Sequence, residues 1–129
     1  MELEKIVIDG IENIYNLSVV RKELRKSVNE PWKATPPWKR YQKKLIEDLA
    51  VLSKYREQAI MFPQFEKLSG VDNQYSIRHP ETLKNVRVLY TITDDSYVIL
   101  LLVFLEKSSS DYQVAIKKAK ERIQWLKDD

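Results

Sequence analysis

The chain has 129 residues, of which 43% are hydrophobic and 32% are charged, as is typical of one soluble globular domain and not of a disordered chain. It has no cysteine, which excludes disulfides, thiolate nucleophiles and cysteine-based zinc sites, and its two glycines argue against a glycine-rich phosphate loop. The net charge of +3 leaves two interpretations open, a solubilising surface or an anionic partner.

The amino terminus shows no secretory signal, because residues 1–9 lack a basic segment followed by an apolar one. The most apolar run, residues 98–105, is far shorter than the ~20 residues that a membrane helix needs. We therefore expect a cytoplasmic protein without membrane contact.

Residues 1–36 predict a short strand, a helix and a proline-rich connector. The strand covers residues 5–9 and ends at Gly10, and the helix covers residues 11–28, where apolar residues recur at helical spacing. A strand over the first half of that helix stays open, because Tyr15, Val19 and Val20 also suit a strand. Three prolines between residues 29 and 37 disfavour a regular helix in the connector.

Basic residues are clustered in the first third of the chain, and such clusters give affinity for phosphate without sequence specificity. One cluster is Arg21, Lys22, Arg25 and Lys26, and the other is Lys39, Arg40, Lys43 and Lys44.

The clearest helical period starts at Trp38 and continues to Ala59. Its apolar stripe consists of Trp38, Tyr41, Leu45, Leu49, Leu52, Tyr55 and Ala59. The pattern breaks at residues 62–65, and residues 66–70 lead into the strands that follow.

The second half of the chain predicts three strands and a helix. The strands cover residues 75–78, 85–93 and 97–105, with residues 79–84 as a loop between the first two and a turn at Asp94 and Asp95. The helix begins near Ser110 or Asp111 and has an apolar face that starts at Tyr112. The expected fold is α+β, a single domain over residues 1–129. A curved antiparallel sheet carries two N-terminal helices on one face, with a C-terminal helix docked nearby.

Arg78 and Arg87 each stand in one of these strands. A guanidinium stays charged and is costly to bury, so we expect both to face a wet groove that suits a phosphate-bearing ligand.

The same residues carry a resemblance to a known family. The pattern Tyr75-x-x-Arg78, Arg87-Val-Leu-Tyr90, Val98-Ile-Leu-Leu101, Phe104-x-x-Lys107 and a helix resembles the C-terminal half of RelE/HigB toxins, including their phage-derived relatives. The resemblance covers roughly residues 37–127. It implies a RelE-like fold and a toxin that cleaves mRNA on the ribosome, an mRNA interferase that inhibits translation. The implied partners are the ribosome, mRNA and a cognate antitoxin, expected to be a helix-turn-helix protein, and no cofactor or metal is implied.

The resemblance also assigns residues. Arg87 matches an arginine expected to stabilise the transition-state phosphate, Arg78 a second phosphate contact, and Lys107 the basic segment after the last strand. Lys67 sits where family members carry a lysine before the sheet. With Lys84 and His79 in the 79–84 loop, it completes the candidate substrate-binding residues.

The chain departs from the family where relatives carry histidines before the phenylalanine of the last strand, since here those positions are Leu102 and Val103. His79, the one histidine, lies in another loop and reads more readily as a solvated residue than as a displaced base. Two alternatives therefore remain: an active endoribonuclease, or a catalytically weakened module of the same fold that binds an antitoxin or RNA. Arg87 also has a purely structural interpretation, in which it pairs with an aspartate across the sheet.

Overall fold

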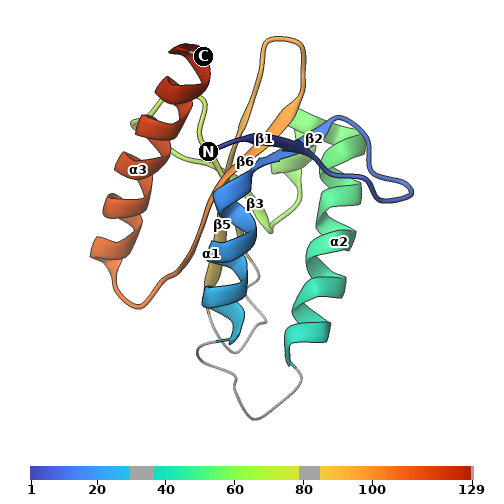
Figure 1. Cartoon of the computed structure of the whole chain (residues 1–129), viewed down its shortest axis with the longest axis horizontal. Helices are drawn as coiled ribbons and strands as arrows, with labels where there is room; N and C mark the ends of the chain where they lie inside the picture. The colour runs from blue at the N-terminus through green and yellow to red at the C-terminus, as the bar shows by residue number, and fades with distance from the viewer. Residues whose placement is uncertain (30–36, 79–84, 129) are drawn as a thin grey trace.

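The computed structural model describes residues 1–29, 37–78 and 85–128 (Figure 1). Within these residues the protein is an α+β domain with three α-helices and a six-stranded mixed sheet of order β1-β2-β6-β5-β4-β3. The elements are β1 (Leu3–Lys5), β2 (Ile14–Leu17), α1 (Ser18–Asn29), α2 (Pro37–Tyr55), the 3-10 helix η1 (Arg56–Met61), β3 (Phe65–Lys67), β4 (Tyr75–Arg78), β5 (Val86–Ile92), β6 (Val98–Leu105) and α3 (Ser109–Asp128).

The late strands form the antiparallel meander that the sequence predicts. β4 pairs with β5 and β5 pairs with β6, with a register shift between Leu89 and Tyr90. β6 lies in the interior of the sheet, so its first six residues are buried and its sequence is apolar instead of alternating. The three-residue strand β3, which the sequence did not predict, adds to the edge at β4.

The start of the chain differs from the expectation. The predicted helix over residues 11–28 begins at Ser18, and its first part is strand β2, the alternative that Tyr15 had left open. β2 pairs in parallel with β6, so the expected wholly antiparallel sheet is wrong and the sheet is mixed. Parallel neighbours need a long connection between them. Here that connection contains both N-terminal helices and the strands β3, β4 and β5.

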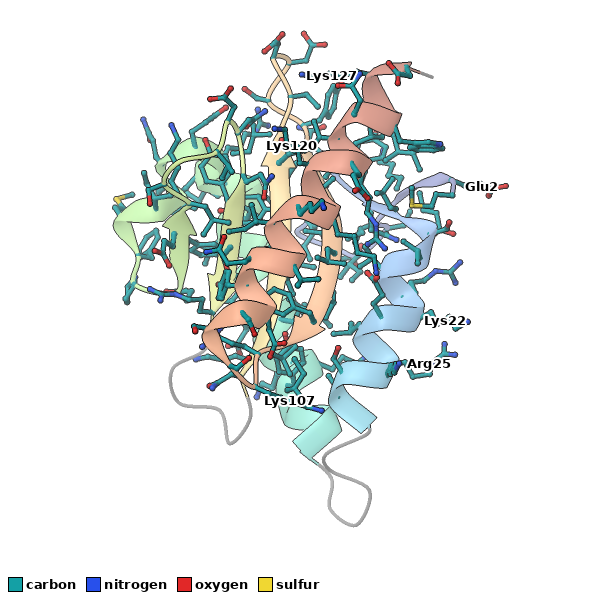
Figure 2. The ribbon with its side chains drawn as sticks, turned by 90° about the vertical axis from the view of Figure 1, so that its left-hand side faces the viewer. Glu2, Lys22, Arg25, Lys107, Lys120 and Lys127 are labelled. Atoms are coloured by element: carbon teal, nitrogen blue, oxygen red, sulfur yellow. The ribbon has the colours of Figure 1, made fainter. Side chains whose placement is uncertain are left out.

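The placement of the helices also corrects the expectation of two N-terminal helices on one face. Figures 1 and 2 show α3 over one face of the sheet, α2 over the opposite face, and α1 beside the edge of β6. The reason is local: Leu17 ends β2 and Ser18 begins α1 without a turn, so the helix continues along the strand direction.

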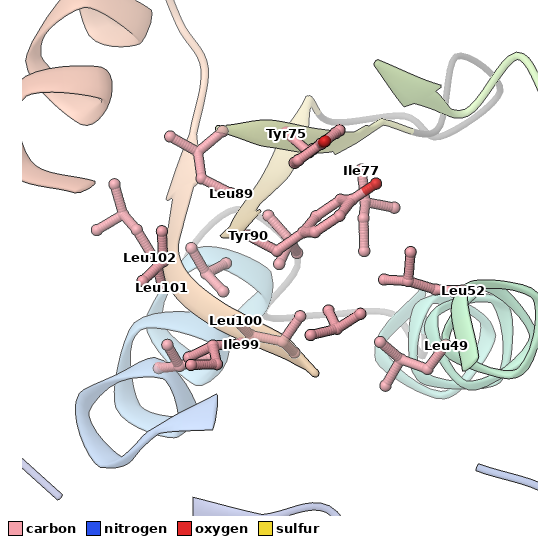
Figure 3. Close-up of a cluster of buried hydrophobic side chains, with 14 of the residues drawn as sticks. Leu49, Leu52, Tyr75, Ile77, Leu89, Tyr90, Ile99, Leu100, Leu101 and Leu102 are labelled. Carbon is pink, nitrogen blue, oxygen red and sulfur yellow. The ribbon is translucent and has the colours of Figure 1, made fainter. Parts of the chain in front are cut away.

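The core lies on both sides of the sheet. On the α2 side, Leu49 and Leu52 point toward Ile77, Tyr90 and Leu100 (Figure 3). Tyr90 stacks on Tyr75 with ring centroids 5.1 Å apart. Each large apolar side chain fully buried in this way stabilises the fold by about 1.5–3 kcal/mol.

Helix α3 begins slightly earlier than predicted because the Asp111 carboxylate caps its first turn. Asp111 accepts hydrogen bonds from the backbone N–H groups of Lys107 (2.7 Å) and Ser108 (2.9 Å), so the helix starts at Ser109. Gln74 ties the helix to the sheet by donating to the Ile116 carbonyl. Among the described residues, no helix is long and apolar enough to cross a membrane.

Candidate functional site

Arg78 and Arg87 are direct cross-strand neighbours on β4 and β5. Residues opposite each other in a strand pair point to the same face of the sheet. Arg87 is also opposite Phe104, whose ring packs edge-on against Tyr112 of α3 at 5.1 Å, so both arginines lie on the α3 face. The structure therefore brings together the two arginines that the sequence singled out.

Arg87 is the more buried of the two and is held by a carboxylate. Its Nε donates to Glu106 Oε1 at 3.0 Å, and its side chain is only 11% exposed. Its Nη1 is buried and has no hydrogen-bond partner among the described residues. A buried guanidinium nitrogen without a partner loses its hydration uncompensated, so this nitrogen keeps an unused donor although almost none of its surface is open to solvent.

Arg78 is open to solvent and only loosely paired. Its Nη1 lies 3.2 Å from Glu66 Oε2, and the two side chains are 42% and 44% exposed. An exposed ion pair of this kind contributes little, about 0–1 kcal/mol, so a ligand can displace either partner at small cost. Arg78 therefore offers a guanidinium that can change partner, and Glu66 offers an accessible carboxylate beside it.

Tyr112 is a member of the site that the sequence had placed on the apolar face of the last helix. Its hydroxyl lies 2.6 Å from Ser76 Oγ. Burial raises the pKa of the Tyr112 hydroxyl, and the Ser76 hydrogen bond and the charges of Arg87 and Arg78 oppose the rise only in part. Tyr112 therefore stays protonated at neutral pH, and its hydroxyl can either donate or accept the hydrogen bond with Ser76.

Lys107 lies at the same end of the sheet. It follows Glu106, the partner of Arg87, and the Glu106 N–H donates to the Asn85 carbonyl at the start of the β5 segment. The Lys107 side chain is exposed, while its backbone is fixed by Asp111. Lys107 is therefore a solvent-exposed cation whose backbone is held by hydrogen bonds.

Lys67 is separated from the arginines. It is in register with Tyr75, whereas its neighbour Glu66 is in register with Ser76, so Lys67 points to the α2 face and Glu66 to the α3 face. Lys84 and His79 lie outside the described residues. In place of those three, the structure adds Glu66, Glu106 and Tyr112 to the site.

The positions where RelE/HigB toxins carry histidine correspond to core residues of this chain. Leu102 and Val103 are both buried within β6. A base at these positions would not reach solvent at the Arg78 end of the sheet. Among the described residues, no group of three or more histidine, aspartate or glutamate side chains is arranged to hold a metal ion.

No protein family, curated protein or solved structure matches this chain.

Proposed function

We propose that this chain is an RNA-cleaving toxin of the RelE/HigB kind, which acts on ribosome-bound mRNA and is silenced by a cognate antitoxin. The observation that carries the proposal is the juxtaposition of Arg78 and Arg87 on adjacent strands, with the buried Nη1 of Arg87 left without a partner. Two guanidinium groups on one face form a site for the negatively charged oxygens of a phosphodiester.

The cleavage step needs a base, a charge clamp and a proton donor. The base removes the proton of the 2′-hydroxyl, the 2′-oxygen attacks phosphorus, and the bond from phosphorus to the 5′-oxygen breaks. The 5′-oxygen takes up a proton from water as it leaves, which gives a 2′,3′-cyclic phosphate and a 5′-hydroxyl. Arg78 and Arg87 clamp the charge that builds on the phosphorane, with Lys107 as an outer cation.

Glu66 is the residue we assign as the base. It is the accessible carboxylate beside Arg78, and it replaces the histidine that the chain lacks in its last strand. Tyr112 stays protonated, so it orients a phosphate oxygen by hydrogen bonding and does not accept the proton.

A second function is favoured by the pairing of Arg87. Its guanidinium is largely buried against Glu106, so it has an ion-pair partner as in the structural interpretation of this arginine, although the partner is a glutamate and not the expected aspartate. On that view the protein is a non-catalytic module that binds RNA or its antitoxin without cleaving.

The two functions separate in one assay with matched variants. The purified protein and its Glu66→Gln and Lys67→Gln variants are incubated with ribosome-bound mRNA, and the 5′ ends are mapped by primer extension. A lost general base costs about 10²–10⁴ in rate, so we expect Glu66→Gln to lose at least 100-fold. Lys67→Gln changes the neighbouring residue on the opposite face and should cleave like the wild type.

The outcomes assign the function. A wild-type protein that binds RNA without cleaving it supports the binding module. Cleavage that survives Glu66→Gln unchanged removes Glu66 as the base while leaving the toxin proposal in place.

The antitoxin should cover this charged end of the sheet. Electrostatic complementarity steers such encounters, so its association rate should fall as salt rises. A rate independent of salt would indicate that the antitoxin docks elsewhere.

A further inference from the structure

The outer face of α1 is crowded with cations. Four of the six residues from Arg21 to Lys26 are basic, and the side chains of Arg21, Lys22, Arg25 and Lys26 are all exposed. Figure 2 shows Lys22 and Arg25 projecting from α1 away from the body of the protein. This set of four residues is called the α1 basic face below.

Most of this charge is not neutralised within the protein. Arg21 pairs with Glu4 at 2.6 Å, but no hydrogen bond or ion pair joins Lys22, Arg25 or Lys26 to another described residue. The one acidic residue of α1, Glu23, is turned inward to Arg122. Like charges four residues apart on a helix repel each other, and both Lys22 with Lys26 and Arg21 with Arg25 stand at that spacing.

The α1 basic face also lacks the apolar anchors of a protein interface. The large hydrophobic residues exposed in the described structure come from other elements, and none belongs to α1. Protein interfaces are centred on buried aromatic or aliphatic anchors, whereas a nucleic-acid backbone is bound by cations alone. The composition of this face therefore favours phosphates over an acidic protein.

We infer that the α1 basic face is a docking surface for the phosphate backbone of RNA, separate from the Arg78–Arg87 site. Lys22, Arg25 and Lys26 are the contacts, because they are the cations without an internal partner. The contacts reach backbone phosphates, so binding is independent of base sequence and weakens steeply with salt. The inference is independent of whether the protein cleaves.

The test measures binding of a fluorescently labelled uridine 20-mer by anisotropy, as a function of salt. The variant Lys22→Gln/Arg25→Gln/Lys26→Gln removes three cations from α1. The matched control, Lys117→Gln/Lys118→Gln/Lys120→Gln, removes three exposed cations from α3. Both variants are first checked for wild-type thermal unfolding, and polyglutamate of similar length is used as a competitor.

Each phosphate contact to single-stranded nucleic acid contributes about −0.7 to the slope of log K against log salt, so loss of three contacts should flatten the slope by about two. We expect this change in the α1 variant and a wild-type slope in the α3 variant. Equal flattening in both variants, or none in the α1 variant, would overturn the inference. Polyglutamate that competes as well as unlabelled RNA would assign the face to an acidic protein instead.

The test of the α1 basic face can fail or succeed independently of the test of the proposed function. Loss of RNA binding in the α1 variant with Glu66→Gln still binding separates the two surfaces. Failure of the cleavage assay would leave the α1 measurement unaffected.

Discussion

Arg122 of α3 and Glu23 of α1 form a bidentate ion pair that also hydrogen-bonds backbone groups of β6. Arg122 Nη1 donates to Glu23 Oε1 at 2.9 Å, and Nη2 donates to Glu23 Oε2 at 2.8 Å. Nη1 also donates to the Leu101 carbonyl, and the Val103 N–H donates to Glu23 Oε1. The two side chains thus satisfy backbone groups of β6 where β2 has ended and given way to a helix.

Arg122→Ala should be strongly destabilising for this reason. The change leaves the Glu23 carboxylate, 16% exposed, without its partner, and loss of one member of a buried pair costs about 3–5 kcal/mol. Urea unfolding followed by circular dichroism measures the loss. Arg21→Ala, which breaks the exposed pair with Glu4, is the matched control and should cost less than about 1 kcal/mol. Equal losses in the two variants would mean that the Arg122 pair does not support the β6 edge.

Removal of the Tyr90 hydroxyl, in contrast to the loss of Arg122, should stabilise the protein. The hydroxyl is buried without a hydrogen-bond partner among the described residues, while the Tyr90 ring stacks on Tyr75. Removing a buried polar group that lacks a partner relieves its desolvation cost, so Tyr90→Phe should raise the free energy of unfolding by about 1 kcal/mol. Tyr112→Phe is the comparison: its hydroxyl is bonded to Ser76, so its loss should destabilise by about 0.5–1.5 kcal/mol. Destabilisation by Tyr90→Phe would show that its hydroxyl has a partner in solution.

Asp111 should make stability depend on pH at the acidic end. Hydrogen bonds from the backbone N–H groups of Lys107 and Ser108 lower the pKa of Asp111 from its ordinary value of 3.8. A group with a lowered folded pKa contributes its full stabilisation above the unfolded value and loses it as pH falls through the folded pKa. The stability advantage of the wild type over Asp111→Asn should therefore be constant at higher pH and shrink below about pH 3.8.

Urea unfolding at a series of pH values from 7 to 2 measures this difference. Asp95→Asn removes the same charge from the exposed turn between β5 and β6 and is the control. An advantage over Asp111→Asn that persists unchanged at the lowest pH would contradict the capping role of the ionised carboxylate.

Strands β5 and β6 were predictable from the sequence because each is a mostly apolar or β-branched run bounded by turn residues. The strand β2 stood only as an alternative to a helix, because Ile14–Leu17 passes into α1 with no turn between them and its apolar spacing also fits a helix. Its parallel partner β6 is more than 80 residues away, and no local pattern encodes so distant a pairing. The edge strand β3 has only three residues, too few for any period.

The candidate site was predictable only in part. The short link between two strands implies antiparallel pairing, which is why Arg78 and Arg87 could be expected on one sheet. Only the structure gives the strand register. That register makes Arg78 and Arg87 neighbours and places Lys67 on the other face. Tyr112 falls at the apolar spacing of α3, so the sequence indicates a packing role and gives no sign of its hydrogen bond with Ser76.

The most direct test of the central claim is the rate at which ribosome-bound mRNA is cleaved by the wild type, Arg87→Ala, Arg87→Lys and His79→Ala. Loss of one donor to a developing oxyanion costs about 10²–10³ in rate, so Arg87→Ala should fall at least that far. Arg87→Lys should recover little of it, because an ammonium cannot reproduce the planar fork of a guanidinium. Circular dichroism and thermal unfolding confirm that each variant is folded. His79→Ala should cleave like the wild type, and an inactive His79→Ala beside an active Arg87→Ala would contradict the account.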